Sequence, residues 1–250
     1  MSSDRPRVPL PVARSLRQEA GFGCACCGNP FVEYHHIVPY AVDQHFREAD
    51  MLALCPYCHH AANIGAMTEH TQREHKRNPY NLKNGRATGQ LWVNQSVCTV
   101  KLGSLVFSNN GRILEINGEP IISIEACEDG RVELSLTLYD EQDNLILQIV
   151  KNEWIHGDVG VWDFEYGFNK LTLRTKHRSI DLHIDASNPG SPIYIRADLW
   201  RLGKAVRVNK QGVYIDRSLK ERPSISGISF DRMYMKLDFI NDIYGLEVDI

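Results

Sequence analysis

The 250-residue sequence has no apolar run long enough to cross a membrane and no strong excess of charge of either sign. A membrane-spanning protein is therefore not expected. No secretory signal peptide is recognisable at the start, so we expect a cytoplasmic protein. The formal net charge is only −3. Proteins that coat nucleic acid carry a large positive charge, so any contact with DNA must be local.

The composition is ordinary for a globular protein, with 43% hydrophobic and 24% charged residues. The length suits a small domain followed by a medium one. Residues 1–90 hold ten Lys and Arg against eight Asp and Glu, together with seven of the ten histidines. Residues 91–250 hold 18 against 23 and are mildly acidic. We predict domains at 1–90 and 91–250, with phosphate contact favoured in the first.

The cysteines are few and odd in number, at seven, which argues against a complete disulfide framework. Four of them form two C-x2-C pairs with 27 residues between the pairs: Cys24 with Cys27, and Cys55 with Cys58. Two such pairs supply the four soft ligands that tetrahedral zinc prefers. We therefore predict a structural Zn²⁺ held by these four cysteines. The neighbouring Cys26 is expected to pack beside them.

Histidines lie inside this cysteine frame and just beyond it. His59 and Asn63 are four residues apart, so on a helix that begins after Cys58 they project from the same face and can approach one ion. His35 and His36 are adjacent in an extended run, so their side chains face opposite ways. Cutting a phosphodiester requires a base that activates water and a cation that stabilises the developing charge. One of the adjacent histidines is expected to bind the ion and the other to act as base, and strand geometry alone leaves the choice open.

These motifs together resemble the HNH (ββα-metal) endonucleases of zinc-ribbon type, over about residues 13–66. Four segments carry the likeness: the CACCG knuckle, the HHIVP strand, the MLALC segment that leads to the second cysteine pair, and the CPYCHH start of a helix. The spacing of the motif positions is H-H-x13-D-x8-H-x3-N. The resemblance implies a metal-dependent endonuclease that hydrolyses DNA. It implies that His35, His59 and Asn63 bind a catalytic Mg²⁺ or another divalent ion, and that His36 is the general base.

One position departs from the family pattern. Asp50 stands where the family has an asparagine, and no asparagine occurs between residues 30 and 62. In the family that asparagine holds the connecting loop so that the base histidine is correctly aimed. Aspartate keeps the acceptor atoms but loses the amide donors. We expect activity to survive; the alternative is a catalytically weakened, zinc-stapled module that binds nucleic acid without cutting it.

From Leu91 onward, apolar residues recur with period two, which is typical of half-buried strands. The pattern is clearest in one run of alternating apolar positions: Val132, Leu134, Leu136 and Leu138. Turn signals such as Asn117-Gly118 separate roughly ten to thirteen short strands. The fold class predicted for the chain is α+β: a small ββα-metal nuclease domain followed by an all-β domain. A sandwich is the favoured arrangement of the strands, and an elongated hairpin stack is the alternative.

The β domain has no catalytic constellation. It can choose the DNA target, form a homo-oligomer, or sense a ligand or protein trigger, as in a bacterial antiviral or restriction effector. Its acidity favours sensing or assembly over DNA reading. The alternation of Asp181, His183 and Asp185 with apolar residues predicts a solvated strand face. Arg14 and Arg17, on a helix predicted over residues 13–20, are likewise interpreted as a solvated face rather than a phosphate contact.

Overall fold

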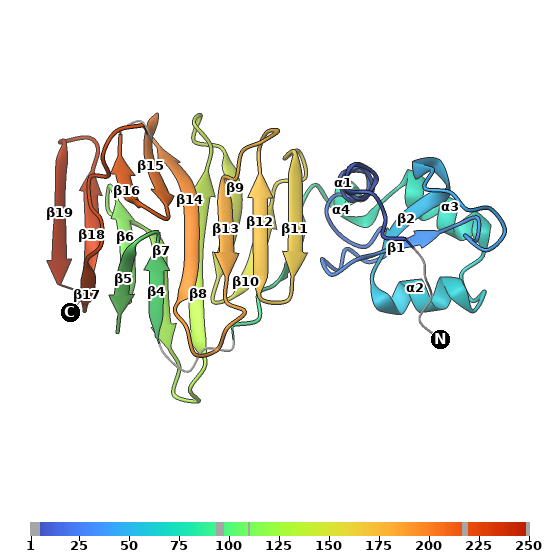
Figure 1. The fold of residues 1–250 in the computed structure, drawn as a ribbon, viewed down its shortest axis with the longest axis horizontal. Helices are drawn as coiled ribbons and strands as arrows, with labels where there is room; N and C mark the ends of the chain where they lie inside the picture. The colour runs from blue at the N-terminus through green and yellow to red at the C-terminus, as the bar shows by residue number, and fades with distance from the viewer. Residues whose placement is uncertain (1–5, 94–97, 110, 217–219, 249–250) are drawn as a thin grey trace.

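The computed structural model describes residues 6–93, 98–109, 111–216 and 220–248, and it is mostly β, with the helices near the N-terminus (Figure 1). The helices are α1 (Leu10–Glu19), α2 (Pro56–Asn63), α3 (Glu69–Arg77) and α4 (Tyr80–Asn84), with a 3-10 turn, η1 (Glu48–Asp50). Two short strands among them, β1 (Glu33–His36) and β2 (Met51–Leu54), pair antiparallel. This content agrees with the predicted α+β class. No helix in the described ranges is both long and apolar enough to span a membrane.

The remaining strands form two large sheets. The eight-stranded sheet has the order β19-β18-β6-β7-β8-β9-β10-β3. Its strands are β3 (Ala87–Gln90), β6 (Arg112–Ile116), β7 (Glu119–Ala126), β8 (Val132–Tyr139), β9 (Leu145–Val150), β10 (Glu153–Gly157), β18 (Met233–Asp238) and β19 (Ile243–Val248). The strand β3 joins this sheet by pairing with β10, so residues 87–90 extend the β domain.

The nine-stranded sheet follows the path β11-β12-β13-β14-β4-β5-β17, and β15 and β16 branch from β14. Its strands are β4 (Thr99–Leu102), β5 (Leu105–Ser108), β11 (Asp163–Gly167), β12 (Lys170–Arg174), β13 (Leu182–Asp185), β14 (Ile193–Arg201), β15 (Lys204–Asn209), β16 (Gly212–Ile215) and β17 (Ser229–Asp231). Three pairings in the two sheets are parallel and join distant segments: β14 with β4, β17 with β5, and β18 with β6.

The two sheets face each other across one hydrophobic core. Each strand buries alternate residues, as β8 does with Val132, Leu134, Leu136 and Leu138. Residues of both sheets belong to a single buried cluster, so the strands form a sandwich rather than an elongated stack. Each buried aliphatic or aromatic side chain stabilises such a core by about 1.5–3 kcal/mol. The strands outnumber the sequence-based prediction because several are only three or four residues long and show little alternation.

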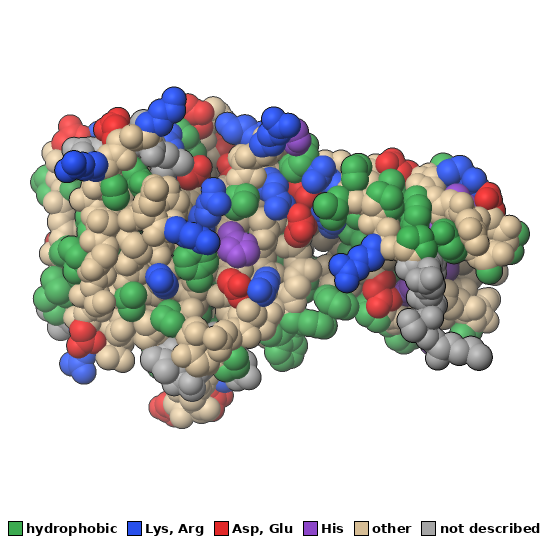
Figure 2. Space-filling view, viewed as in Figure 1, with side chains coloured by type: hydrophobic (Ala, Val, Ile, Leu, Met, Phe, Trp, Pro, Cys, Tyr) green, Lys and Arg blue, Asp and Glu red, His purple; other side chains and the backbone are tan. Residues whose placement is uncertain are grey.

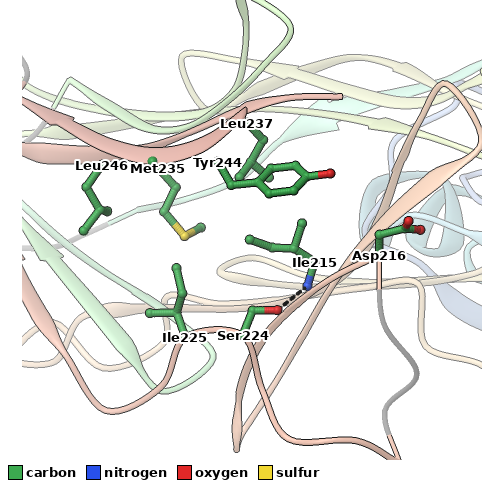
Figure 3. A pocket seen from close by; sticks show the side chains of 9 residues that line it. Ile215, Asp216, Ser224, Ile225, Met235, Leu237, Tyr244 and Leu246 are labelled. Carbon is green, nitrogen blue, oxygen red and sulfur yellow. Dashed lines mark hydrogen bonds between the residues drawn. The ribbon is translucent and has the colours of Figure 1, made fainter. Parts of the chain in front are cut away.

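The sandwich is incomplete at its C-terminal edge. On β19, Tyr244 and Leu246 lie opposite the buried Leu237 and Met235 of β18 but remain exposed themselves. Figure 3 shows these side chains facing Ile215 and Ile225 across a cavity of about 590 Å³. Its lining is largely apolar, and the hydroxyl of Ser224 accepts the backbone N–H of Ile215 at 3.0 Å.

The predicted helices form with recognisable end signals. The helix expected over residues 13–20 begins one turn earlier, after Pro9, and the chain turns away at Gly21, whose φ is 64°. Helix α3 begins after Thr68, whose hydroxyl accepts the backbone N–H of Thr71 at 3.2 Å. Helix α2 begins with Pro56 in its first turn.

Helix α1 is attached to the sandwich by a buried carboxylate. Asp163, the first residue of β11, has 0% exposure and accepts hydrogen bonds from Arg17 at 2.9 Å and from Arg14 at 3.2 Å. Arg174 lies 3.5 Å from the same carboxylate. Arg17 also donates to the hydroxyl of Tyr34 on β1 at 2.7 Å. The interpretation of Arg14 and Arg17 as a solvated face is therefore wrong, because both side chains bind a buried carboxylate. That carboxylate lies about 150 residues away in sequence, so no local pattern indicates it.

The Asp163→Asn substitution tests this attachment. It removes the fully buried negative charge on which the half-buried guanidinium groups of Arg14 and Arg17 converge, so we expect the free energy of unfolding to fall by about 3 kcal/mol. Urea denaturation followed by tryptophan fluorescence measures the change. Asp129→Asn is the control, since Asp129 pairs with Arg131 at the surface and its loss should leave stability unchanged. Equal stabilities of the two variants would contradict a structural role for Asp163.

Candidate metal centre and histidine site

The four cysteines of the predicted zinc site converge. Their sulfur atoms all lie within 4.8 Å of one another, and Cys27 Sγ is 3.7 Å from Cys55 Sγ. With Zn–S bonds of about 2.3 Å, the sulfurs of a tetrahedral site lie about 3.8 Å apart. Three of the four side chains are buried and Cys27 is exposed. The cluster therefore fits a metal ion such as zinc.

Local structure brings these sulfurs together. The first pair lies in a tight turn in which the backbone N–H of Gly28 donates to the carbonyl of Cys24 at 2.8 Å. Gly28 has φ 76°, and a Cβ atom there would lie 2.5 Å from Asn81 Oδ1, so only glycine fits. In the second pair, Cys55 is the N-cap of α2 and Cys58 lies in its first turn. The cluster thus joins a turn after α1 to the start of α2.

The sulfurs influence one another strongly. A hydrogen bond from the thiol of Cys26 lowers the pKa of Cys24 to about 4. Burial raises the pKa of Cys27 to about 11, and burial also raises the pKa of Cys58. Four thiolates at these separations repel one another, and a divalent cation relieves that repulsion. Cys26 itself packs 3.9 Å from the sulfur of Met67, which matches its predicted packing role.

His35 and His59 meet beside the second cysteine pair. Their ring centroids are 5.0 Å apart in an edge-to-face arrangement. His35 is buried on β1, and His59 lies on α2, one turn after Cys55. Each ring is held by a second side chain. His35 Nε2 lies 3.0 Å from Gln72 Oε1, and His59 Nδ1 lies 2.5 Å from Glu33 Oε2.

These contacts define which ring nitrogen carries a proton. The amide nitrogen of Gln72 donates to the carbonyl of Met67, so its oxygen faces His35 and accepts from His35 Nε2–H. The carboxylate of Glu33 accepts from His59 Nδ1–H in the same way. In the neutral rings, the nitrogen that does not face these acceptors is Nδ1 of His35 and Nε2 of His59. A carboxylate or amide that fixes the tautomer of a histidine is the usual support of a metal-binding imidazole.

His36 points to the other side of β1. Its Nε2 donates to the backbone carbonyl of His45 at 2.8 Å, so Nδ1 is the basic atom of the neutral ring. The rings nearest to it are those of Tyr40, His45 and Phe46, with centroids 5.1 to 5.9 Å away. His35 and His36 are adjacent on β1 and therefore point to opposite faces of the strand, as strand geometry requires.

Asp50 and Asn63 occupy the ends of short elements. Asp50, in η1, accepts hydrogen bonds from Arg47 at 3.0 Å and from Arg73 of α3 at 3.2 Å. The hydrogen bond from Arg47 is the main reason that the pKa of Asp50 is lowered. Its acceptors therefore tie the connecting segment to α3. Asn63 is the exposed last residue of α2, and its side chain forms no hydrogen bond within the described ranges.

No protein-family model, curated protein or solved structure matches this chain. The geometry supplies a four-cysteine cluster that can hold a metal ion such as zinc. It also supplies a supported pair of imidazoles next to that cluster. Function must therefore be argued from these side chains.

Three residues around the histidines had not been singled out in the sequence. Glu33 could have been found, because it lies two residues before His35 and shares its strand face. Gln72 is buried on a helix whose other residues are polar, so no periodicity marked it. His45 lies in a loop without a repeating pattern, and its contact with His36 depends on tertiary folding.

Substitution of Cys55 tests the metal cluster. We expect the purified chain to contain one zinc ion, and Cys55→Ser to lose it and to unfold α2, because zinc binding and folding are coupled at such sites. Elemental analysis measures the zinc, and circular dichroism measures the helix content. Cys127→Ser, outside the cluster, should retain both. Full zinc occupancy in Cys55→Ser would rule out this ligand set.

The Glu33→Gln substitution tests the support of His59. Loss of the carboxylate should weaken the binding of Mn²⁺ by about 10- to 100-fold while the fold and the zinc content stay unchanged. Isothermal titration calorimetry with Mn²⁺ measures this affinity. Glu74→Gln is the control, because Glu74 pairs with the exposed His70 on α3 and is not among the contacts of the His59 ring. An unchanged affinity in Glu33→Gln would mean that the His59 ring needs no such support.

Proposed function

We propose that the chain is a metal-dependent endonuclease that hydrolyses phosphodiester bonds of DNA. The observation that carries the proposal is the approach of His35 and His59 to a ring separation of 5.0 Å, with each ring held by its own acceptor. Two imidazoles with defined lone pairs on facing elements suit one divalent cation. The resemblance to the HNH endonucleases supports the same assignment.

The residues divide into structural and catalytic roles in this proposal. The four cysteines hold a closed structural zinc site without a position for water. His35 and His59 bind the catalytic ion, together with Asn63, which lies one helical turn beyond His59. When bound, a divalent ion such as Mg²⁺ supplies the positive charge that stabilises the leaving 3′ oxygen. Two imidazole ligands also suit Mn²⁺, Ni²⁺ or Zn²⁺.

His36 is the general base in this proposal. Its Nε2–H is held by the carbonyl of His45, and in this proposal Nδ1 takes the proton of the attacking water. The rings of Tyr40 and Phe46 limit the rotation of the imidazole. The two ring nitrogens therefore have separate duties, one in orientation and one in proton transfer.

The charge at Asp50 is compatible with a phosphate site. A bare carboxylate would repel the substrate, but Asp50 lies between the guanidinium groups of Arg47 and Arg73. These ion pairs also anchor the loop that the family holds with an amide. The same contacts are also compatible with the alternative function, a module that binds nucleic acid without cutting it. A cleavage assay distinguishes this module from an endonuclease.

Nicking of a supercoiled plasmid with added Mg²⁺ or Mn²⁺ tests the proposal. We expect the wild type to cut, and His36→Ala and His59→Ala to lose at least about 100-fold in rate, because each removes a proton acceptor or a metal ligand. His70→Ala, an exposed histidine of α3, is the matched control and should cut normally.

Zinc content and thermal melting verify that each variant is folded. Normal cutting by His36→Ala would remove His36 from the mechanism. A wild type that binds DNA but does not cut it with either ion would favour the non-cleaving module.

A further inference from the structure

The outer face of the nine-stranded sheet carries two rows of polar side chains. Strand register aligns Thr172, His183 and Arg196 in one row. It aligns the following residues in the next row: Lys170, Asp185, Tyr194 and Lys101. Figure 2 shows Lys and Arg side chains gathered around a histidine on this face of the sandwich. This surface is therefore more basic than the acidic β domain as a whole.

A hollow of about 530 Å³ lies on this face. Its lining includes His183, Tyr194, Arg196 and Lys210. The His183 and Tyr194 rings have centroids 6.3 Å apart, and together with Ile180 they give the hollow an apolar part. The hollow thus combines cationic groups with a surface on which a flat or apolar group can lie.

Some donors of this face are already used, as Lys170 is by Asp185, but others in the hollow are not used within the described ranges. The hydroxyl of Tyr194 is buried and has no hydrogen-bond partner there. Buried polar groups almost always have a partner, so an acceptor from outside the described residues, a ligand oxygen or a water, is expected at this hydroxyl. Arg196, Lys101 and Lys210 form no ion pair with any described residue, although each carries a full positive charge at neutral pH.

The acidic groups nearby already have partners. Asp185, the acid beside Tyr194, is paired with Lys170 at 2.9 Å and accepts from the hydroxyl of Ser187. Farther along β14, Asp198 lies opposite Arg207 of β15. The lining of the hollow itself holds Arg196 and Lys210 and no acidic residue of the described ranges, so its local charge is positive.

We propose that this hollow binds a phosphate group. The Tyr194 hydroxyl and the Arg196 guanidinium donate hydrogen bonds to the phosphate oxygens, and Lys101 and Lys210 add positive charge. The apolar part formed by Ile180, His183 and Tyr194 suits the sugar or base attached to that phosphate. A free nucleotide and the backbone of DNA present the same chemistry. The site is independent of the histidine site and of cleavage.

Two substitutions of the full-length chain test the site. Tyr194→Phe removes only the hydroxyl, and Arg196→Gln removes the charge while keeping a polar side chain. Calorimetric titration with inorganic phosphate and with adenosine monophosphate measures small-ligand binding. Fluorescence anisotropy with a labelled 20-base-pair duplex, without added Mg²⁺, measures DNA binding. Tyr139→Phe and Arg131→Gln are the matched controls, because both residues lie outside the hollow.

We expect Tyr194→Phe to weaken binding about 10-fold and Arg196→Gln by about 10- to 100-fold, with the controls unchanged. Losses with phosphate and the nucleotide would identify a free nucleotide as the ligand. Losses with the duplex alone would identify the DNA backbone. Wild-type affinity of both variants for all three probes, or no binding of any probe by the wild type, would overturn the proposal. None of these outcomes depends on whether the chain cuts DNA.

Discussion

The sulfur atoms of the two cysteine pairs must lie close enough together to share one metal ion. The N-terminal part of the structure depends on this constraint. Its hydrophobic cluster consists mainly of alanine and cysteine, with three larger aliphatic residues, Ile37, Leu52 and Leu54. A core this small contributes little stability. A structural zinc site contributes about 10–16 kcal/mol in small peptides, which is comparable with the whole stability of a domain. Cys55 directly follows β2 and is the N-cap of α2. Bringing the four sulfur atoms together therefore also fixes where α2 starts. His59 then reaches His35 one turn later.

A second anchor lies at the junction with the sandwich. A fully buried carboxylate is costly unless its charge is paired, and Asp163 is paired with arginines of both α1 and β12. Arg17 bonds at the same time to Tyr34, the residue before His35. One side chain thus contacts both the sandwich and the strand that carries the histidines. The position of β1 is set by contacts with the sandwich as well as by the cysteine cluster.

Local sequence patterns predicted much of this structure. Cysteine spacing predicted the cluster, helical spacing placed His59, and period-two alternation identified the longer strands. Two of the failures share a cause, which is distance along the chain. The partner of Arg14 and Arg17 lies in β11, and the parallel pairings of β14 with β4 and β18 with β6 join segments about 90 to 120 residues apart. Gln72 was missed because a buried position on a uniformly polar helix has no periodic mark. Sequence patterns report the periodicity of an element but not its neighbours.

The acidity of residues 91–250 argues against a DNA-reading face, and the outer face of the nine-stranded sheet shows why an average charge misleads. At physiological salt, exposed charges act over about 8 Å, so a ligand at Tyr194 responds to its neighbours and not to the domain total. Several acids of the domain are neutralised elsewhere, as Glu119 is by Arg201. Around Tyr194, the one adjacent acid is paired with Lys170, while Arg196 and Lys101 have no counter-ion within the described ranges. Strand register, which places these side chains in two rows, therefore decides the sign of the local potential.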